Sequence, residues 1–324
     1  MYNQTELILA QYEIEICGIT KGRGTFLCDT NKGMKLLVPF RGSKEKGMLL
    51  REFLAGLNQT GFVADEIELN LSQEAVTEDE NTGERFILKN YVEGTEINTG
   101  RAEDMKEAVK VLALFHNASE RIHVEMPEQM TKENVVESYR RHYRELIKAR
   151  NYIRNRKKKC EFEQIYMKNF EHNRASAEQS LMLLEAGKED CPRSLFCHGD
   201  FNQHNVLLSE GQYRLVHYEN FVYNWGILDL VNFLRKMLEK NEWNEVLGRE
   251  LIMMYDRYRP LEEAERKRLY GLLLFPEKFW KVTNHYMNSR KSWISEKDVE
   301  KLKKVIELEE KRLNFMENIF AFLR

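Results

Sequence analysis

Several features that mark specialised classes of protein are missing from this sequence. No apolar run approaches the roughly 20 residues that a membrane-spanning helix needs. The first residues, MYNQTELILAQYEIEI, lack the basic flank and apolar stretch of a secretory signal. No CxxC pair and no Cys/His pairing at the spacing of a zinc site occurs, so we expect reduced thiols and neither a disulfide framework nor a zinc site. The cysteines are Cys17, Cys28, Cys160, Cys191 and Cys197.

An excess of charge of one sign is missing as well. The chain has 50 Lys and Arg against 52 Asp and Glu, which gives a formal net charge of −2. Nothing global therefore attracts it to nucleic acid or to anionic lipid. With 42% hydrophobic and 31% charged residues, the composition is that of a soluble globular protein, and the length allows two lobes. We expect a cytoplasmic protein that has neither a membrane span nor a nucleic-acid partner.

The first ninety residues predict a small β-rich lobe. Short runs rich in β-forming residues are separated by Gly, Asn and Lys turns, which is typical of consecutive hairpins. Apolar residues spaced by three and four across 44–60 predict one helix, which ends before Gly61. The predicted strands are 12–19, 24–29, 34–40, 65–72 and 84–92.

Long helical patterns dominate from Arg101 onward. They cover 102–118, most of 133–187, and the chain from 226 to its end, whereas 195–222 returns to loop and strand. The fold class is therefore α+β, with a small antiparallel N-lobe (residues 1–92) and a larger, mainly helical C-lobe (93–324). Two lobes with a ligand cleft between them are the plan of a nucleotide-dependent phosphotransferase.

A basic stretch, YRRHYRELIKARNYIRNRKKK, lies within the helical region at 139–159. It could form a contact surface for nucleic acid or for acidic partners. It could also be one solvated part of a helical hairpin, balanced by the acidic residues that follow it. We prefer the second interpretation.

The segment HGDFNQHN at 198–205 contains the candidate residues for phosphoryl transfer. Phosphoryl transfer needs a carboxylate that orients the acceptor hydroxyl, and charge that holds the phosphates. Asp200 is the candidate for the first role. Asn205, five residues later, is a candidate magnesium ligand, because that ion prefers oxygen donors. His198 is expected to brace the loop. A hairpin-like SEGQY turn and an apolar strand follow, which makes the motif more specific.

HGDFNQHNVLL resembles the catalytic loop of the aminoglycoside-phosphotransferase and choline-kinase branch of the protein-kinase-like fold. Within that branch the chain is similar to the spore coat protein family typified by CotS. The segments that carry this similarity include FILKNYVEGTEI, GILDLVNFLRKMLEK and HYMNSRKSWISEKDVEKLKKVIELEEKRLNFMENI.

The resemblance implies a bilobal protein-kinase-like fold, synthesis in the mother-cell cytoplasm, assembly into the spore coat, and other coat proteins as partners. It also implies a nucleotide-binding hinge at Asn90, Tyr91 and Val92, and a loop-supporting role for Asp229. ATP and Mg²⁺ are the implied cofactors if the chain is active.

The chain departs from this branch just after the catalytic loop. Where the family carries a metal-binding aspartate, RLVHYENF places His217. A neutral imidazole is a poor match for magnesium. Glu219 could substitute, because alternate residues of an extended segment point the same way. Otherwise His217 is a strand residue that only packs.

The phosphate-binding lysine of the third strand is also missing. Its position falls on Val38. Lys35 stands in odd register to Val38, so we expect its side chain on the opposite face, and Arg41 is expected beyond the strand. The usual helix partner of that lysine could be Glu52.

The glycine-rich cover is indistinct. Gly22 and Gly24 in ITKGRGTF could bring backbone N–H groups to a phosphate, or could form an ordinary hairpin turn. We prefer the turn.

These losses predict a degenerate kinase. The preferred hypothesis is a spore coat scaffold with little or no phosphotransferase activity. An ATP-dependent small-molecule kinase with Asp200 as base and atypical metal ligation is the alternative, and nucleotide binding without transfer is a third. Aromatic residues of the C-terminal part could line an acceptor pocket, although core packing is the preferred interpretation. They are Phe275, Phe279, Trp280, Tyr286 and Trp293.

Overall fold

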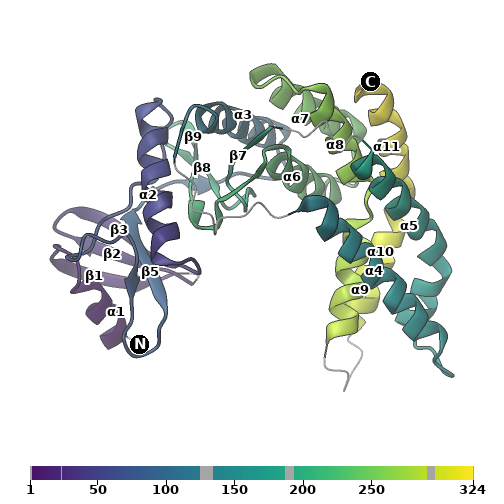
Figure 1. The fold of residues 1–324 in the computed structure, drawn as a ribbon, viewed down its shortest axis with the longest axis horizontal. Helices are drawn as coiled ribbons and strands as arrows, with labels where there is room; N and C mark the ends of the chain where they lie inside the picture. Colours follow the sequence, from purple (N-terminus) through teal and green to yellow (C-terminus); the bar gives the residue numbers. More distant parts are fainter. Residues whose placement is uncertain (1, 23, 125–133, 187–192, 290–295, 324) are drawn as a thin grey trace. The chain divides into compact units, whose positions relative to one another are not determined.

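The computed structural model describes residues 2–22, 24–124, 134–186, 193–289 and 296–323 (Figure 1). Contacts divide the chain into two compact units. The first unit comprises Met1–Asn98, Glu107–Met130 and Leu195–Val222, and the second comprises Thr99–Lys106, Thr131–Ser194 and Tyr223–Arg324. The catalytic-loop segment therefore belongs to the same unit as the N-terminal strands. The lobe boundary at residue 92 stays a prediction.

A five-stranded sheet in the order β1-β2-β3-β5-β4 forms the first unit's frame, and its paired strands are antiparallel. The predicted hairpins are confirmed. The short helix α1 (Tyr2–Leu9), which was not predicted, leads into Tyr12, and Ile8, Leu9 and Tyr12 pack with Leu37 and Leu88. The strands are β1 (Ile16–Lys21), β2 (Phe26–Thr30), β3 (Gly33–Pro39), β4 (Thr77–Glu78) and β5 (Arg85–Asn90).

The strand predicted at 65–72 is wrong. This segment makes one isolated bridge, Ile67 to Lys89, and then turns. The cause is Asn70, whose side-chain oxygen accepts from the backbone N–H groups of Ser72 (3.0 Å) and Glu74 (2.9 Å). Local side-chain bonds of this kind compete with a strand ladder.

Helix α2 (Lys44–Gln59) is confirmed at the predicted place and lies beside β3 and β5 in Figure 1. It begins at Ser43, whose side chain accepts from the Lys46 N–H. On its buried face, the ring of Phe53 lies 4.8 Å from that of Phe196 in a tilted arrangement and stacks 6.1 Å from that of Phe221, measured between ring centroids. These rings tie the helix to the segments on either side of the catalytic loop.

The rest of the first unit surrounds that loop. A second small sheet has the order β6-β8-β9, and its β8–β9 hairpin is the strand pair expected after the catalytic loop. The elements here are α3 (Ala102–Ser119), β6 (Thr95–Glu96), β7 (Ser194–Cys197), β8 (Val206–Ser209), β9 (Gln212–Leu215), the 3-10 turn η1 (Tyr218–Asn220) and β10 (Val222–Trp225). α3 and β10 each continue into the second unit.

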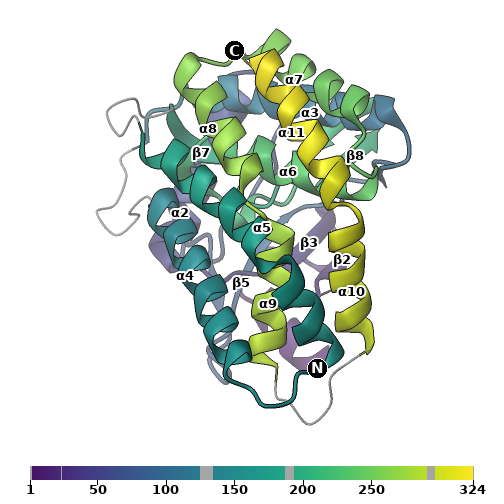
Figure 2. The ribbon, with the colours of Figure 1, turned by 90° about the vertical axis from the view of Figure 1, so that its right-hand side faces the viewer.

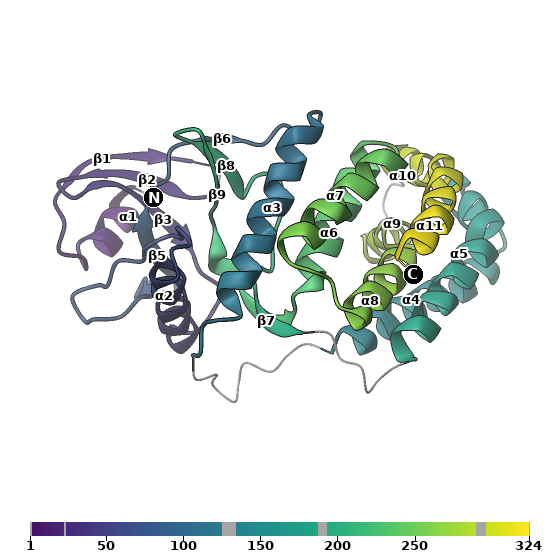
Figure 3. The same ribbon diagram turned by 90° about the horizontal axis from the view of Figure 1, so that it is seen from above.

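The second unit is helical, as predicted. Helices α4, α5, α9 and α10 lie side by side around a core that includes Tyr166, Phe170, Phe279 and Tyr286 (Figure 2). Helices α6, α7, α8 and α11 form the other group (Figure 3). The helices are α4 (Val135–Arg154), α5 (Glu161–Glu185), α6 (Ile227–Lys240), α7 (Glu245–Tyr258), α8 (Glu263–Leu274), α9 (Glu277–Asn288), α10 (Glu296–Glu307) and α11 (Glu309–Leu323).

Two further predictions concern residues of this unit. Phe279 and Tyr286 are core residues, whereas Trp293 lies outside the described residues. Part of the basic stretch is neutralised by acids on α5, for example Arg150 by Glu171 at 3.8 Å. Among the residues that the structure describes, no helix is both long and apolar enough to cross a membrane.

We predict that Phe53, whose ring packs against Phe196 and Phe221, is essential for the stability of the first unit. Phe53→Ala is expected to lower the free energy of unfolding by about 3–5 kcal/mol, because it leaves a cavity among rings that cannot close around it. Glu52→Ala, one residue away on the exposed face, is the control and should change it by less than about 0.5 kcal/mol. Urea unfolding followed by circular dichroism measures both, and equal effects would contradict this assignment of the core.

Candidate functional site

The catalytic-loop segment starts where β7 ends, and His198 braces it from inside. His198 is fully buried. Its Nε2 donates to the carbonyl of Val216 (2.9 Å), and its Nδ1 accepts from the Asp200 backbone N–H (3.3 Å). These two partners require a neutral imidazole with its proton on Nε2. The imidazole therefore joins the loop to the strand end that precedes His217.

Two asparagine side chains hold the other side of the loop. Asn202 and Asn205 both donate through Nδ2 to the Asp200 carbonyl, at 2.9 and 2.8 Å. Because Nδ2 of Asn205 makes this hydrogen bond, its amide oxygen is the side-chain atom that could act as a metal ligand. Asp200 itself is half-buried. The role of its carboxylate in orienting an acceptor stays a prediction.

Gly199 has no room for a side chain. Its backbone has φ +80°, and a Cβ added there would lie 2.0 Å from the carbonyl oxygen of Asn220. The catalytic loop and the segment after His217 therefore touch backbone to backbone at this point. Both the positive φ and the close approach require glycine.

A buried lysine occupies the sheet face that lacks its expected lysine. Leu36 pairs with Lys89 and Lys35 pairs with Asn90 across β3 and β5. Directly paired residues point to the same face, so Lys89 shares a face with Leu36 and Val38. Lys35 points to the opposite face, as predicted, where its Nζ donates to Glu68 and Asn90.

Lys89 joins three segments through its ammonium group. It donates to Asp65 Oδ2 at 2.6 Å, forms an ion pair with Glu219, and lies 3.2 Å from His217 Nδ1. Asp65 Oδ2 also accepts from the His217 backbone N–H at 3.1 Å. The side chains of Lys89 and Asp65 are 4% and 2% exposed, so water screens this pair little. We call Lys89, Asp65, Glu219 and His217 the charge cluster.

The charge cluster shifts the pKa values of its members in opposite senses. Burial by itself lowers the pKa of Lys89, but Asp65 and Glu219 raise it, and the net pKa lies above the usual value. Burial by itself raises the pKa of Glu219, but Lys89 and the neighbouring His217 outweigh burial and hold that pKa well below its usual range. Both groups are therefore charged at neutral pH.

The charge cluster does not fit a magnesium ion. The carboxylate of Glu219 is already neutralised by Lys89, and the Nδ1 lone pair of His217 faces the same ammonium. Of the predicted ligands, the amide oxygen of Asn205 is then the one that suits a hard cation. Within the described part of the chain, no group of three His, Cys, Asp or Glu side chains could hold a metal ion. His217, with φ +67°, adopts the left-handed conformation that histidine tolerates better than most residues.

Lys89 and Asp65 were not predicted as site residues, and other residues were considered instead. Glu52, the expected helix partner, is exposed on α2. Arg41 lies beyond β3, as expected. A charged residue inside the otherwise buried run Phe86–Lys89 was a signal that this lysine must have buried partners.

The remaining predicted residues belong to turns and to the expected hinge. Gly22 donates to the Thr25 carbonyl (2.8 Å) and Gly24 donates to the Gly22 carbonyl (3.0 Å), so both N–H groups are used within the β1–β2 turn. Tyr91, in the expected hinge, donates to the Met34 carbonyl (3.1 Å). Asn90 Nδ2 donates to Glu66 Oε2 (2.8 Å), and Val92 follows in the same loop.

Asp229 lies in the second unit, near the start of α6. It is 1% exposed, and its backbone N–H donates to the Gly226 carbonyl at 3.3 Å. A buried carboxylate requires polar partners, which fits a structural role. Its predicted support of the catalytic loop stays a prediction.

An antiparallel N-terminal sheet with a helix after its third strand, followed by this loop and a mainly helical region, defines the class: a protein-kinase-like fold of the aminoglycoside-phosphotransferase type. The chain belongs to the spore coat family described as "Spore coat putative kinase YutH", whose model matches residues 5–319. It is also 23% identical to Spore coat protein S of Bacillus subtilis over 309 residues, which cover 92% of this chain and 87% of that protein. The resemblance found in the sequence is thereby confirmed.

Solved structures show the same fold. An aminoglycoside phosphotransferase from Alicyclobacillus acidocaldarius superposes with a TM-score of 0.86 at 18% identity, covering 98% of this chain and 96% of that one. Spectinomycin phosphotransferase APH(9)-Ia, in complex with ADP and spectinomycin, gives 0.67 at 16% identity, with 97% and 98% covered. At such identities the likeness establishes the fold alone.

The close contact at Gly199 predicts that adding one methyl group there lowers the stability strongly. Gly199→Ala should lower the thermal midpoint, because overpacking costs about 1–3 kcal/mol beyond the strain of a positive φ. Gly211→Ala is the matched control, since Gly211 has φ +78° but no atom within 4 Å of the place where a Cβ would stand, so it should show only about 1–2 kcal/mol of strain. If the control were as harmful as Gly199→Ala, the packing argument would fail.

The depressed pKa of Glu219 predicts a pH dependence. Its folded-state pKa lies below its unfolded value, so the stability it contributes is present above about pH 4.3 and is lost as the pH falls below that. The free energy of unfolding of wild type should therefore exceed that of Glu219→Gln at about pH 5, and this difference should shrink as the pH falls towards 3. Urea midpoints measured across this range test the expectation.

The control for that series is Glu263→Gln. Glu263 pairs with Lys267 on the surface of α8, where its side chain is 82% exposed. Solvent screening makes such a pair nearly neutral for stability. Parallel curves for wild type and Glu219→Gln would show that Lys89 does not depend on this carboxylate.

Proposed function

We propose that this protein is a structural component of the spore coat whose kinase-like site performs little or no phosphoryl transfer. The observation that carries the proposal is the ion pair of Lys89 with Glu219. It neutralises the carboxylate nearest the usual metal position, and His217 occupies that position itself. Without a magnesium site, the charge of transferring phosphates has no counterion.

Family membership supports the location in this proposal. The chain is made in the mother-cell cytoplasm and joins the coat, where its partners are other coat proteins. A kinase-like fold serves such a role without nucleotide, because the charge cluster and the Phe53 rings hold the catalytic-loop region in place.

One observation favours a second function, an ATP-dependent small-molecule kinase. Lys89 brings a buried ammonium to the face where the family carries its phosphate-binding lysine, and the Asp200 loop keeps its geometry. In that case Asp200 orients the acceptor hydroxyl as base, and Asn205 with Glu219 would hold the metal. Glu219→Ala must then reduce activity more than His217→Ala does.

A thermal-shift titration with ATP and magnesium distinguishes these functions. Wild type should show no magnesium-dependent shift at millimolar ATP, whereas a ligand at about 100 times its dissociation constant would add about 2.7 kcal/mol. His217→Asp, which restores a carboxylate, should introduce a shift. His217→Asn, of equal size but uncharged, is the matched control and should not.

Phosphotransferase activity of the wild-type protein would be the result that contradicts the structural proposal. Transfer of phosphate from ATP to any acceptor, lost in Asp200→Ala, would overturn the structural proposal and establish the kinase. A shift with ATP and no turnover would instead establish nucleotide binding without transfer.

A further inference from the structure

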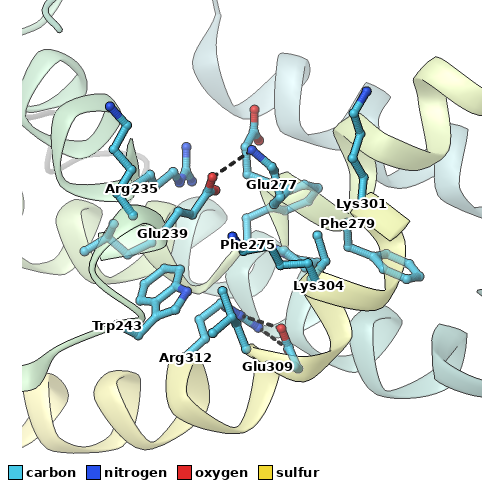
Figure 4. A pocket seen from close by; sticks show the side chains of 16 residues that line it. Arg235, Glu239, Trp243, Phe275, Glu277, Phe279, Lys301, Lys304, Glu309 and Arg312 are labelled. Atoms are coloured by element: carbon cyan, nitrogen blue, oxygen red, sulfur yellow. Dashed lines mark hydrogen bonds and ion pairs between the residues drawn. The ribbon is translucent and has the colours of Figure 1, made fainter. Parts of the chain in front are cut away.

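A cavity of about 310 Å³ lies entirely within the second unit (Figure 4). It is lined by α6 and the loop that follows it, by the end of α8 and the start of α9, and by α10 and α11. No residue of the 198–219 segment contributes to it. Its size is at the lower end of the roughly 300–1,000 Å³ of small-molecule sites.

The cavity wall combines aromatic rings with positive charge. Trp243, Phe275 and Phe279 supply apolar surface, as the close-up shows. Six cationic side chains but only three carboxylates line the cavity. The cations are Arg235, Lys240, Lys278, Lys301, Lys304 and Arg312, and the carboxylates are Glu239, Glu277 and Glu309.

Each lining carboxylate already has a cation. Glu239 accepts from Lys278 at 2.8 Å, and Glu309 accepts from Arg312 at 2.7 Å, as the dashed lines of Figure 4 mark. Glu277 pairs with Lys281 at 3.2 Å, outside the cavity lining. By contrast, no carboxylate of a described residue lies within 4.0 Å of Arg235, Lys240 or Lys304. The cavity therefore keeps an excess of positive charge.

Two buried polar atoms of the lining lack a hydrogen-bond partner. Arg235 is 6% exposed, and its Nε has no acceptor although its Nη2 donates to the Leu272 carbonyl. Glu277 Oε2 has no hydrogen bond either, but His142 Nδ1, outside the cavity lining, faces it at 3.9 Å. Buried polar atoms are normally satisfied, so the unpaired Arg235 Nε is the lining atom that suggests an anionic partner.

We propose that this cavity binds a small organic anion with an aromatic body. The aromatic body packs on Trp243, Phe275 and Phe279. The anionic group pairs with Arg235 and with Lys240 and Lys304. This site is independent of the phosphotransfer chemistry argued above.

Two fluorescent probes test the proposal on the full chain. Anilinonaphthalene sulfonate has an aromatic body, an N–H donor and an anionic group, and phenylnaphthylamine is the same molecule without the sulfonate. The sulfonate should bind at least about tenfold more tightly, as expected for one charge-assisted contact. Equal affinities would overturn the proposal.

Charge reversal on the exposed part of the lining locates the sulfonate. Lys240→Glu combined with Lys304→Glu should abolish its preference and leave phenylnaphthylamine binding unchanged. The matched control is Lys148→Glu combined with Lys168→Glu, which makes the same charge change on exposed positions of α4 and α5. If both double variants lost the preference equally, long-range charge and not this cavity would be responsible.

A cavity-filling variant supplies the second measurement. Leu308→Trp should displace both probes, with circular dichroism unchanged from wild type. Binding of either probe at wild-type affinity in a folded Leu308→Trp protein would place the probes elsewhere and overturn the proposal.

Discussion

The ammonium group of Lys89 is the interaction on which the catalytic-loop region depends. It joins the end of β5, the connection after α2 and the segment after β9, which are distant in sequence. Each carboxylate that it neutralises would otherwise be a buried, unpaired charge, and such a charge is strongly destabilising. Asp65 extends the link by accepting from the His217 backbone. These ion pairs thus hold the region together alongside the Phe53 rings and the hydrogen bonds of His198 and Asn205.

The same interaction opposes metal binding. A magnesium ion on Glu219 would have to displace Lys89, and the two cations would then repel each other at short range. Asp65 makes that displacement less costly, because it can hold the ammonium by itself. In the structure the ammonium holds both carboxylates, so Glu219 is neutralised by Lys89.

Local patterns predict the elements, whereas non-local pairing creates the charge cluster. Helix α2 was predictable because its apolar spacing and its Ser43 cap lie within one segment. The loop was predictable because Asp200 and Asn205 meet over five residues. Lys89 was not predictable as a site residue. The face of the sheet to which it points follows from the β3–β5 register, and its partners Asp65 and Glu219 lie 24 and 130 residues away in the sequence.

Most of the catalytic-loop motif is explained by packing without catalysis. His198 is required for its bonds to Val216 and Asp200, Gly199 for its approach to Asn220, and Asn205 for its bond across the loop. Their presence is therefore weak evidence of activity. Asp200 contributes its backbone N–H and carbonyl to these contacts. Substitution of its side chain therefore tests catalysis while leaving these backbone bonds of the loop in place.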